Sequence, residues 1–267
     1  MRRYLEFYLT SMKIAILQQL QYPVANYFYM IGMIAEPVIY LVVWSTVAMA
    51  QGGSVGGYSP SDFAAYYIVW TLVRNMNIVF TPYGWEARIQ RGFLSSELLR
   101  PLHPLHFDIS YFAGWKVVMI LLWIPLALVL SLIFKPNLHP TGLEVIVFFF
   151  AIWGAYLIRT MLLSILGMIT FWTTRVGAIY EMFFALELVL SGRLVPMSLM
   201  PAWVQHIANF LPFQWTFGFP IEVLVGKLST EQLFKGLGMQ LLWILIGTLG
   251  VRILWRFGIR RYSAVGN

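Results

Sequence analysis

The sequence predicts an all-α integral membrane protein with six transmembrane helices, and its composition is the main reason. Hydrophobic residues make up 60% of the 267 residues, whereas charged residues make up only 11%. Soluble domains contain about 25% charged residues, so this composition excludes a water-soluble globular enzyme. Aromatic residues make up 17%, which is enough to supply belts at both membrane interfaces. The length accommodates about six spanning helices of roughly 25 residues with their loops.

Residues 1–23 are predicted to form an amphipathic helix that lies in the membrane interface and ends near Pro23. Its apolar residues recur at spacings of three and four and share one helical face: Leu5, Leu9, Met12, Ile16 and Leu20. Glu6 and Lys13 interrupt the apolar stretch, which excludes a secretory signal peptide. An ordinary amphipathic helix packed against protein is the alternative.

Six apolar segments are long enough to be predicted as transmembrane helices. They are residues 24–49, 61–85, 107–134, 143 to about 172, 177 to about 195, and 236–255. Pro37 predicts a kink in the first span. The uncharged, glycine-rich run at 52–57 predicts a short outer loop before the second span.

Residues 196–225 are apolar but do not fit a straight transmembrane helix. Four prolines interrupt them: Pro196, Pro201, Pro212 and Pro220. Backbone groups freed by proline cannot face lipid, so we expect two short half-helices at 202–210 and 213–225 that dip into the outer face of the membrane.

The distribution of basic residues predicts the orientation. With six spans both termini lie on one side, and eleven of the 18 lysines and arginines fall on that side, against four on the other. The positive-inside rule therefore places both termini in the cytoplasm. We expect a multi-pass protein of the cell (inner) membrane. We expect the whole chain, 1–267, to form a single transmembrane domain. The net charge of +7 then reports orientation, and we expect no nucleic-acid partner.

No catalytic or metal-binding constellation is apparent in the sequence. The chain lacks cysteine, and Pro104 interrupts the helix that would align His103 with His106. The run at 226–228 lacks the first glycine and the Ser/Thr of a nucleotide-binding P-loop. We therefore expect a protein that is not itself catalytic and binds no cofactor or metal.

Charged residues within the spans are candidates for function. Glu36, Arg74 and Arg159 fall near the middle of their spans, where an unpaired charge costs several kcal/mol. We expect Glu36 to pair with Arg74 or Arg159, either to lock helices together or to line a substrate path. Glu187 is a fourth candidate, deep in the fifth span.

The loop at 86–106 is predicted to be a cytoplasmic coupling segment. Its leucines repeat at spacings of four after a short helical stretch, which indicates an amphipathic helix that presents apolar and basic groups to a partner. The candidate contact residues are Arg88, Arg91, Gly92, Leu94, Leu98, Leu99, Arg100 and Pro101. A solvated loop that carries positive-inside charge is the alternative.

These features together resemble the type-2 ABC transporter permeases over essentially the whole chain. Residues 91–94 (RGFL) and 98–102 (LLRPL) are similar to the family's RG-x-L and LLRPL segment after the second span. The proline-rich region at 196–227 looks like the family's outer half-helices, and residues 1–23 match its elbow helix.

The resemblance implies an ATP-driven exporter in which this chain is the membrane permease. It implies a second permease, identical or homologous, that completes the substrate path among membrane lipids. It also implies two ATP-binding cassette subunits, which carry ATP and Mg and sit on the segment from Arg88 to Arg100. Lipids, hydrophobic drugs, peptides and polysaccharide-linked lipids all fit the composition as substrates.

A secondary transporter driven by an ion gradient is the alternative function. In that case Glu36 and Glu187 would carry the coupling ion, and the half-helices would suit such a site. The sequence shows no inverted repeat, and such a transporter would not need a docking loop. A membrane-embedded enzyme is disfavoured because no histidine cluster, Ser–Lys pair or paired carboxylates occur at workable spacing.

Overall fold

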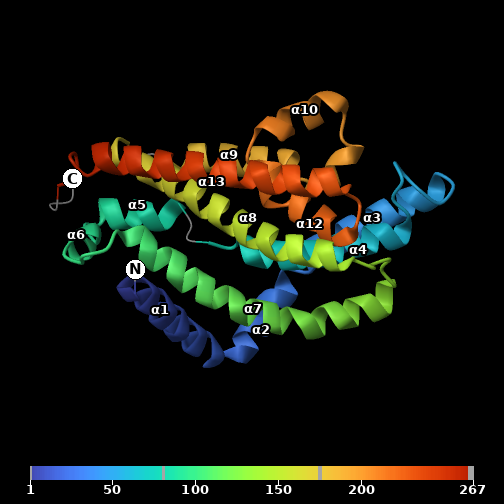
Figure 1. The fold of residues 1–267 in the computed structure, drawn as a ribbon, viewed down its shortest axis with the longest axis horizontal. Coiled ribbons are helices and arrows are strands. Elements are labelled where there is room, and N and C mark those ends of the chain that lie inside the picture. Colours follow the sequence, from blue (N-terminus) through green and yellow to red (C-terminus); the bar gives the residue numbers. More distant parts are fainter. Residues whose placement is uncertain (1, 80–81, 174–175, 264–267) are drawn as a thin grey trace.

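The computed structural model describes residues 2–79, 82–173 and 176–263. Within these ranges the regular structure is helical, apart from an isolated β-bridge between Val55 and Tyr58. The segments are α1 (Arg2–Leu20), α2 (Pro23–Gly32), α3 (Ala35–Ala50), α4 (Pro60–Asn77), α5 (Pro82–Gln90), α6 (Leu94–Leu98), α7 (Pro104–Phe134), α8 (Gly142–Met168), η1 (Ile169–Phe171), α9 (Gly177–Leu190), η2 (Met197–Leu199), α10 (Ala202–Phe210), α11 (Phe213–Thr216), α12 (Gly218–Val225) and α13 (Thr230–Gly258) (Figure 1).

Four helical stretches in the described ranges are long and apolar enough to cross a membrane. They are Pro23–Ala50, Pro104–Phe134, Gly142–Phe171 and Thr230–Gly258. They correspond to the first, third, fourth and sixth predicted spans and indicate a multi-pass membrane protein. The first of them breaks at Met33 and Ile34, because Pro37 has no N–H to donate to the carbonyl oxygen of Met33, and the predicted kink is thereby confirmed.

The second and fifth predicted spans are shorter than expected. α4 ends at Asn77, and α5 begins as a separate helix at Pro82, so a continuous helix over 61–85 is wrong. α9 ends at Leu190. Its 14 residues rise by about 1.5 Å each and reach roughly 21 Å, short of a hydrocarbon core of about 30 Å. A helix to about residue 195 is therefore also wrong, and the six-span topology stays a prediction.

α4 lies at the centre of the fold. A capping box between Ser59 and Asp62 starts this helix, and 15 of its 18 residues are buried against α3, α7, α8 and α12. Because its neighbours are protein rather than lipid, it accommodates polar residues that a lipid-facing helix would not.

Lys116 of α7 stabilises the end of α4. The side chain is fully buried, and its Nζ donates to the carbonyl oxygens of Asn75, at 3.2 Å, and of Ile78. The ring of Trp115 lies 4.6 Å from the same ammonium group. The carbonyl oxygen of Asn75 also accepts a hydrogen bond of 3.4 Å from the backbone N–H of Ile78, and the ammonium group adds a donor where the helix ends.

Three side chains of α4 hold the turn that follows α9. The hydroxyl groups of Tyr66 and Tyr67 and the indole N–H of Trp70 donate to carbonyl oxygens of residues 192–194 at 2.6, 2.9 and 3.1 Å. Gly192 adopts a φ of 81°, a conformation that favours glycine. The turn is therefore hydrogen-bonded although it lies inside the protein.

The proline-rich region contains the predicted short helices with one difference. α10 (Ala202–Phe210) has the predicted bounds. The second half-helix, expected at 213–225, is divided into α11 and α12 because the backbone breaks at Phe217. α12 packs against α4 and α8 and is largely buried, so it belongs to the protein interior.

α1 packs along the beginning of α7. The contact centres on Ala15 and Gly114, and a hydrogen bond of 2.7 Å joins the hydroxyl groups of Ser110 and Ser11. The predicted apolar face is only partly covered, since Leu5 and Leu9 remain more than half exposed. The helix thus has one face on protein and an apolar face that is open, as an interfacial helix would have.

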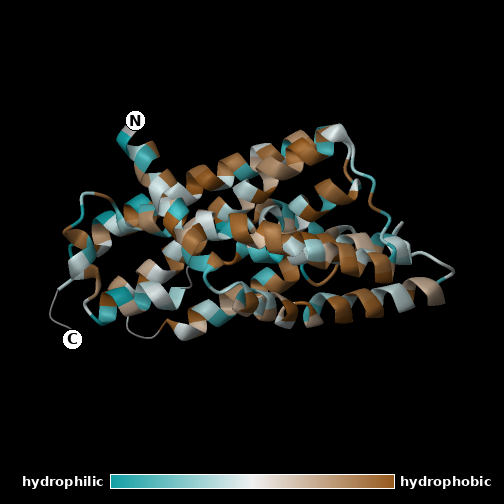
Figure 2. Ribbon diagram, turned by 90° about the horizontal axis from the view of Figure 1, so that it is seen from below, coloured by the Kyte–Doolittle hydropathy of each residue, from teal (hydrophilic) through white to brown (hydrophobic). Residues whose placement is uncertain are grey.

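The helices run between two ends of the molecule (Figure 1). The start of α1, the α5–α6 segment and the end of α13 lie at one end, whereas α10 and the loop after α3 lie at the other. Figure 2 shows apolar residues along the long helices and more hydrophilic residues towards the α5–α6 end.

Substitution Gly114→Leu is expected to weaken the packing of α1 on α7. A Cβ atom at this position would lie 2.5 Å from the carbonyl oxygen of Met12, so the two helices must separate. We expect a loss of roughly 1–3 kcal/mol of unfolding free energy and faster proteolysis of α1. Gly238→Leu on α13 is the control, because nothing lies within 4 Å of its Cβ position. Equal stability of the two variants would contradict this packing.

Candidate coupling surface and intramembrane charge cluster

The α5–α6 segment is anchored to α7 by Arg88. Its guanidinium donates to both carboxylate oxygens of Asp108 at 2.7 Å and contacts Glu97 of α6 at 3.1 Å. Burial opposes the charged form of Arg88, but the two carboxylates outweigh it and raise the pKa of this arginine. Burial opposes the charged form of Glu97 too, and this raises the pKa of Glu97, although Arg88 works against the shift. One side chain therefore fixes both short helices to a long one.

Further contacts hold α6 and the start of α7 against the end of α13. Leu94 is fully buried in a cluster with Trp85 and Val251. The backbone N–H of Ser95 donates to the hydroxyl of Tyr262 at 3.1 Å, and their hydroxyl groups are 2.7 Å apart. The segment is thus a rigid part of the fold.

His103 caps α7 at the same place. Its Nδ1 accepts a hydrogen bond of 3.1 Å from the backbone N–H of Leu105, and its ring lies 4.2 Å from that of Trp255. Burial lowers the pKa of His103 to about 4, so the ring is neutral at physiological pH.

The opposite side of the segment is exposed. Leu99 is 89% exposed and Phe93 is 57% exposed, and Arg91, Leu98, Arg100 and Pro101 are exposed as well. We call these six residues the docking surface. Gly92 adopts a φ of 76° in the turn between α5 and α6. Of the eight residues predicted to contact a partner, Arg88 and Leu94 instead face the protein interior and position the others.

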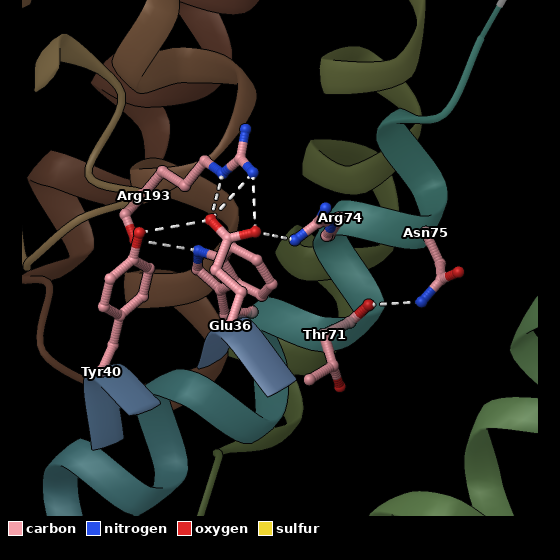
Figure 3. Close-up of polar contacts among 7 residues, drawn as sticks. Glu36, Tyr40, Thr71, Arg74, Asn75 and Arg193 are labelled. Carbon is pink, nitrogen blue, oxygen red and sulfur yellow. Dashed lines mark hydrogen bonds and ion pairs between the residues drawn. The ribbon is translucent and has the colours of Figure 1, made fainter. Parts of the chain in front are cut away.

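A charge cluster lies where α3, α4 and the turn after α9 meet (Figure 3). Arg193 donates three hydrogen bonds to the carboxylate of Glu36. Two come from Nη2, at 2.8 and 2.9 Å, and one comes from Nε, at 3.1 Å. The carboxylate also forms an ion pair with Arg74. Tyr40 donates to the same carboxylate at 3.3 Å, and both guanidinium groups lie over the ring of Trp70.

The predicted pairing is correct for Arg74 and wrong for Arg159. Arg159 forms its ion pair with Glu187, which is buried, and not with Glu36. Sequence reasoning missed Arg193, which lies at the end of the predicted fifth span, as a partner of Glu36. It also missed the role of Lys116. The early end of α9, near Gly192, brings Arg193 back to Glu36.

Attraction between opposite charges in this cluster joins elements that are distant in sequence. Two guanidinium groups surround one carboxylate, and the side chains of all three residues are between 21 and 27% exposed. The part of the chain that the structure describes contains no group of three or more His, Cys, Asp or Glu residues arranged to hold a metal ion. Two guanidinium groups around one carboxylate are suited to holding helices together or to contacting a ligand.

Glu36→Gln is expected to destabilise the protein. Loss of the carboxylate leaves Arg74 and Arg193 facing each other, and their partial exposure reduces the effect below that of a fully buried pair, to about 1–3 kcal/mol. Equilibrium unfolding measures this loss, with the exposed Glu231→Gln as control. A second change, Arg193→Gln, should recover part of it. Unchanged stability of Glu36→Gln would show that the pairing is not structural.

Acidification is expected to destabilise the His103 cap. The unfolded imidazole takes up a proton near pH 6.5, whereas the folded one does so only near pH 4, so stability falls as the pH drops through this interval. The melting temperature at pH 7.5 and pH 5 measures the fall. His103→Asn keeps an acceptor but does not titrate, and its melting temperature should fall less. An identical decrease in both proteins would contradict this role.

The comparisons with known proteins agree with these features. The family model described as ABC-2 family transporter protein matches residues 34–266, which is most of the chain. No curated protein matches the sequence. The matched range includes the charge cluster, the docking surface and the proline-rich region. The chain therefore belongs to the ABC-2 transporter family and is a membrane permease of an ABC transporter, a transport component that is not itself catalytic.

Proposed function

We propose that this chain is the permease of an ATP-driven exporter and that two ATP-binding subunits, which carry ATP and Mg, sit on the docking surface. The observation that carries the proposal is the exposure of Leu99, an apolar side chain that is 89% exposed on a rigidly held segment. Exposed apolar groups flanked by the charges of Arg91 and Arg100 are typical of a protein interface.

Movement of the docking surface would reach the long helices through its anchors. Arg88 connects it to Asp108 of α7, and Ser95 connects it to Tyr262 beyond α13. Closure of the ATP-binding subunits would therefore displace α7 and α13 together. This supports a mechanism in which ATP binding reshapes the membrane domain.

A second permease, identical or homologous, would complete the substrate path. The positive-inside distribution supports a cell (inner) membrane location with the docking surface in the cytoplasm. α10 would then lie on the outer side, because it occupies the opposite end of the molecule (Figure 1). The charge cluster, near the middle of the first span, is a candidate contact for substrate.

An ion-driven transporter is less well supported. Glu36 is held by two arginines, and Glu187 is buried against Arg159. A carboxylate that binds a coupling ion must be free to exchange its partner, and these two are already neutralised by fixed positive charge.

Leu99→Asp tests the proposal. Placing a charge in the middle of the interface should weaken association with the ATP-binding subunits by roughly 2 kcal/mol or more, because buried apolar anchors contribute most to such interfaces. Affinity purification from native membranes measures the ATPase that accompanies the permease, and vesicles measure ATP-dependent export.

Phe210→Asp is the matched control, since Phe210 is 80% exposed and ends α10, a helix that lies away from the α5–α6 segment (Figure 1). It should leave the ATPase bound. Normal association and export with Leu99→Asp, in protein of wild-type stability, would refute the assignment of the docking surface.

A further inference from the structure

A cavity of about 540 Å³ lies at the end of the molecule away from the docking surface, among α10, α12 and the start of α13 (Figure 1). Its volume is within the range of about 300–1,000 Å³ that is usual for small-molecule sites. Four side-chain amides line it: Gln205, Asn209, Gln214 and Gln232. The proposed docking of ATP-binding subunits does not involve this end.

Hydrogen bonds within the wall orient these amides. In several of them either the oxygen or the NH₂ group remains available to a ligand. Gln214 Nε2 donates to Asn209 Oδ1 at 2.9 Å, so the Gln214 oxygen and the Asn209 nitrogen make no hydrogen bond within the described ranges. The oxygen of Gln232 accepts from the N–H of Ser229 at 2.8 Å, which leaves its NH₂ group available. The wall thus offers donors and acceptors in fixed positions.

Two of the lining residues each carry a buried side-chain polar atom that has no partner among the described residues. The atoms are Glu222 Oε1, an acceptor, and Trp215 Nε1, a donor. An unsatisfied buried polar group is costly, so a ligand that bonds to both would be stabilised. One hydroxyl group of a ligand can donate to Glu222 Oε1, and another can accept from Trp215 Nε1. The rings of Trp215 and Phe219, 5.8 Å apart, add an aromatic surface.

The charges of the lining do not favour an ionic ligand. Lys227 forms an ion pair with Asp62 at 3.2 Å, and the other charged residues of the lining are Glu222 and Lys235. An anion would face Glu222, and a cation would face Lys235. We propose that the cavity binds an uncharged, hydroxyl-rich solute of the saccharide class, because amides, a carboxylate and aromatic faces complement sugar hydroxyl groups and ring C–H surfaces.

The test uses the purified full-length chain in lipid nanodiscs, so its outcome does not depend on the ATP-binding subunits. Isothermal titration calorimetry with neutral trisaccharides of glucose, mannose, galactose and N-acetylglucosamine should detect binding by at least one. Glu222→Gln should weaken it roughly threefold to tenfold, since the substitution replaces one acceptor oxygen of the side chain by an NH₂ group. Gln214→Leu should also weaken binding, whereas the exposed Gln51→Leu should not.

Melting temperatures establish that each variant is folded. Binding of none of the trisaccharides by folded wild-type protein would overturn the proposal. Binding of spermidine or tripolyphosphate instead, with loss in the Glu222→Gln or Gln214→Leu variants, would assign the cavity to an ionic ligand and overturn it equally. Trisaccharide binding that is unaffected by both variants would place the saccharide site elsewhere.

Discussion

The helices α4, α9 and α11 end inside the protein, and side chains from other helices bond the backbone groups at those ends. Lys116 donates to carbonyl groups at the end of α4, and Asn77 donates to the carbonyl of Thr216 at the end of α11. Without water at this depth, an unbonded carbonyl group costs several kcal/mol, so each interruption requires a fixed donor. The arrangement of the short helices depends on this constraint.

The same interruptions determine where the charges lie. Because α9 stops after 14 residues, Arg193 follows a tight turn and reaches Glu36 on the first span. Arg159 then pairs with Glu187. Arginine suits these positions, since its planar guanidinium forms several hydrogen bonds at once and stacks on rings such as that of Trp70. The carboxylates of Glu36 and Glu187 are thus both paired with arginine.

Much of the fold could be predicted from local sequence, but among the contacts only the pairing of Glu36 with Arg74 was predicted. The bounds of α10 follow from prolines and an amphipathic pattern, which act within a few residues. The inward direction of Arg88 and Leu94 depends on Asp108 and on residues near Val251, which are distant in sequence. Periodicity along one helix also does not show which helices are neighbours. It therefore could not decide whether Arg159 pairs with Glu36 or with Glu187.

The burial of α4 also has a consequence for biogenesis. This helix is not among the stretches apolar enough to span a membrane alone, and α7, α8 and α12, which cover it, are synthesised later. Its tyrosines and tryptophan bond to residues 192–194, which emerge still later. During translation α4 is therefore made before most of the protein that covers it, and it can become buried only once these elements have been synthesised.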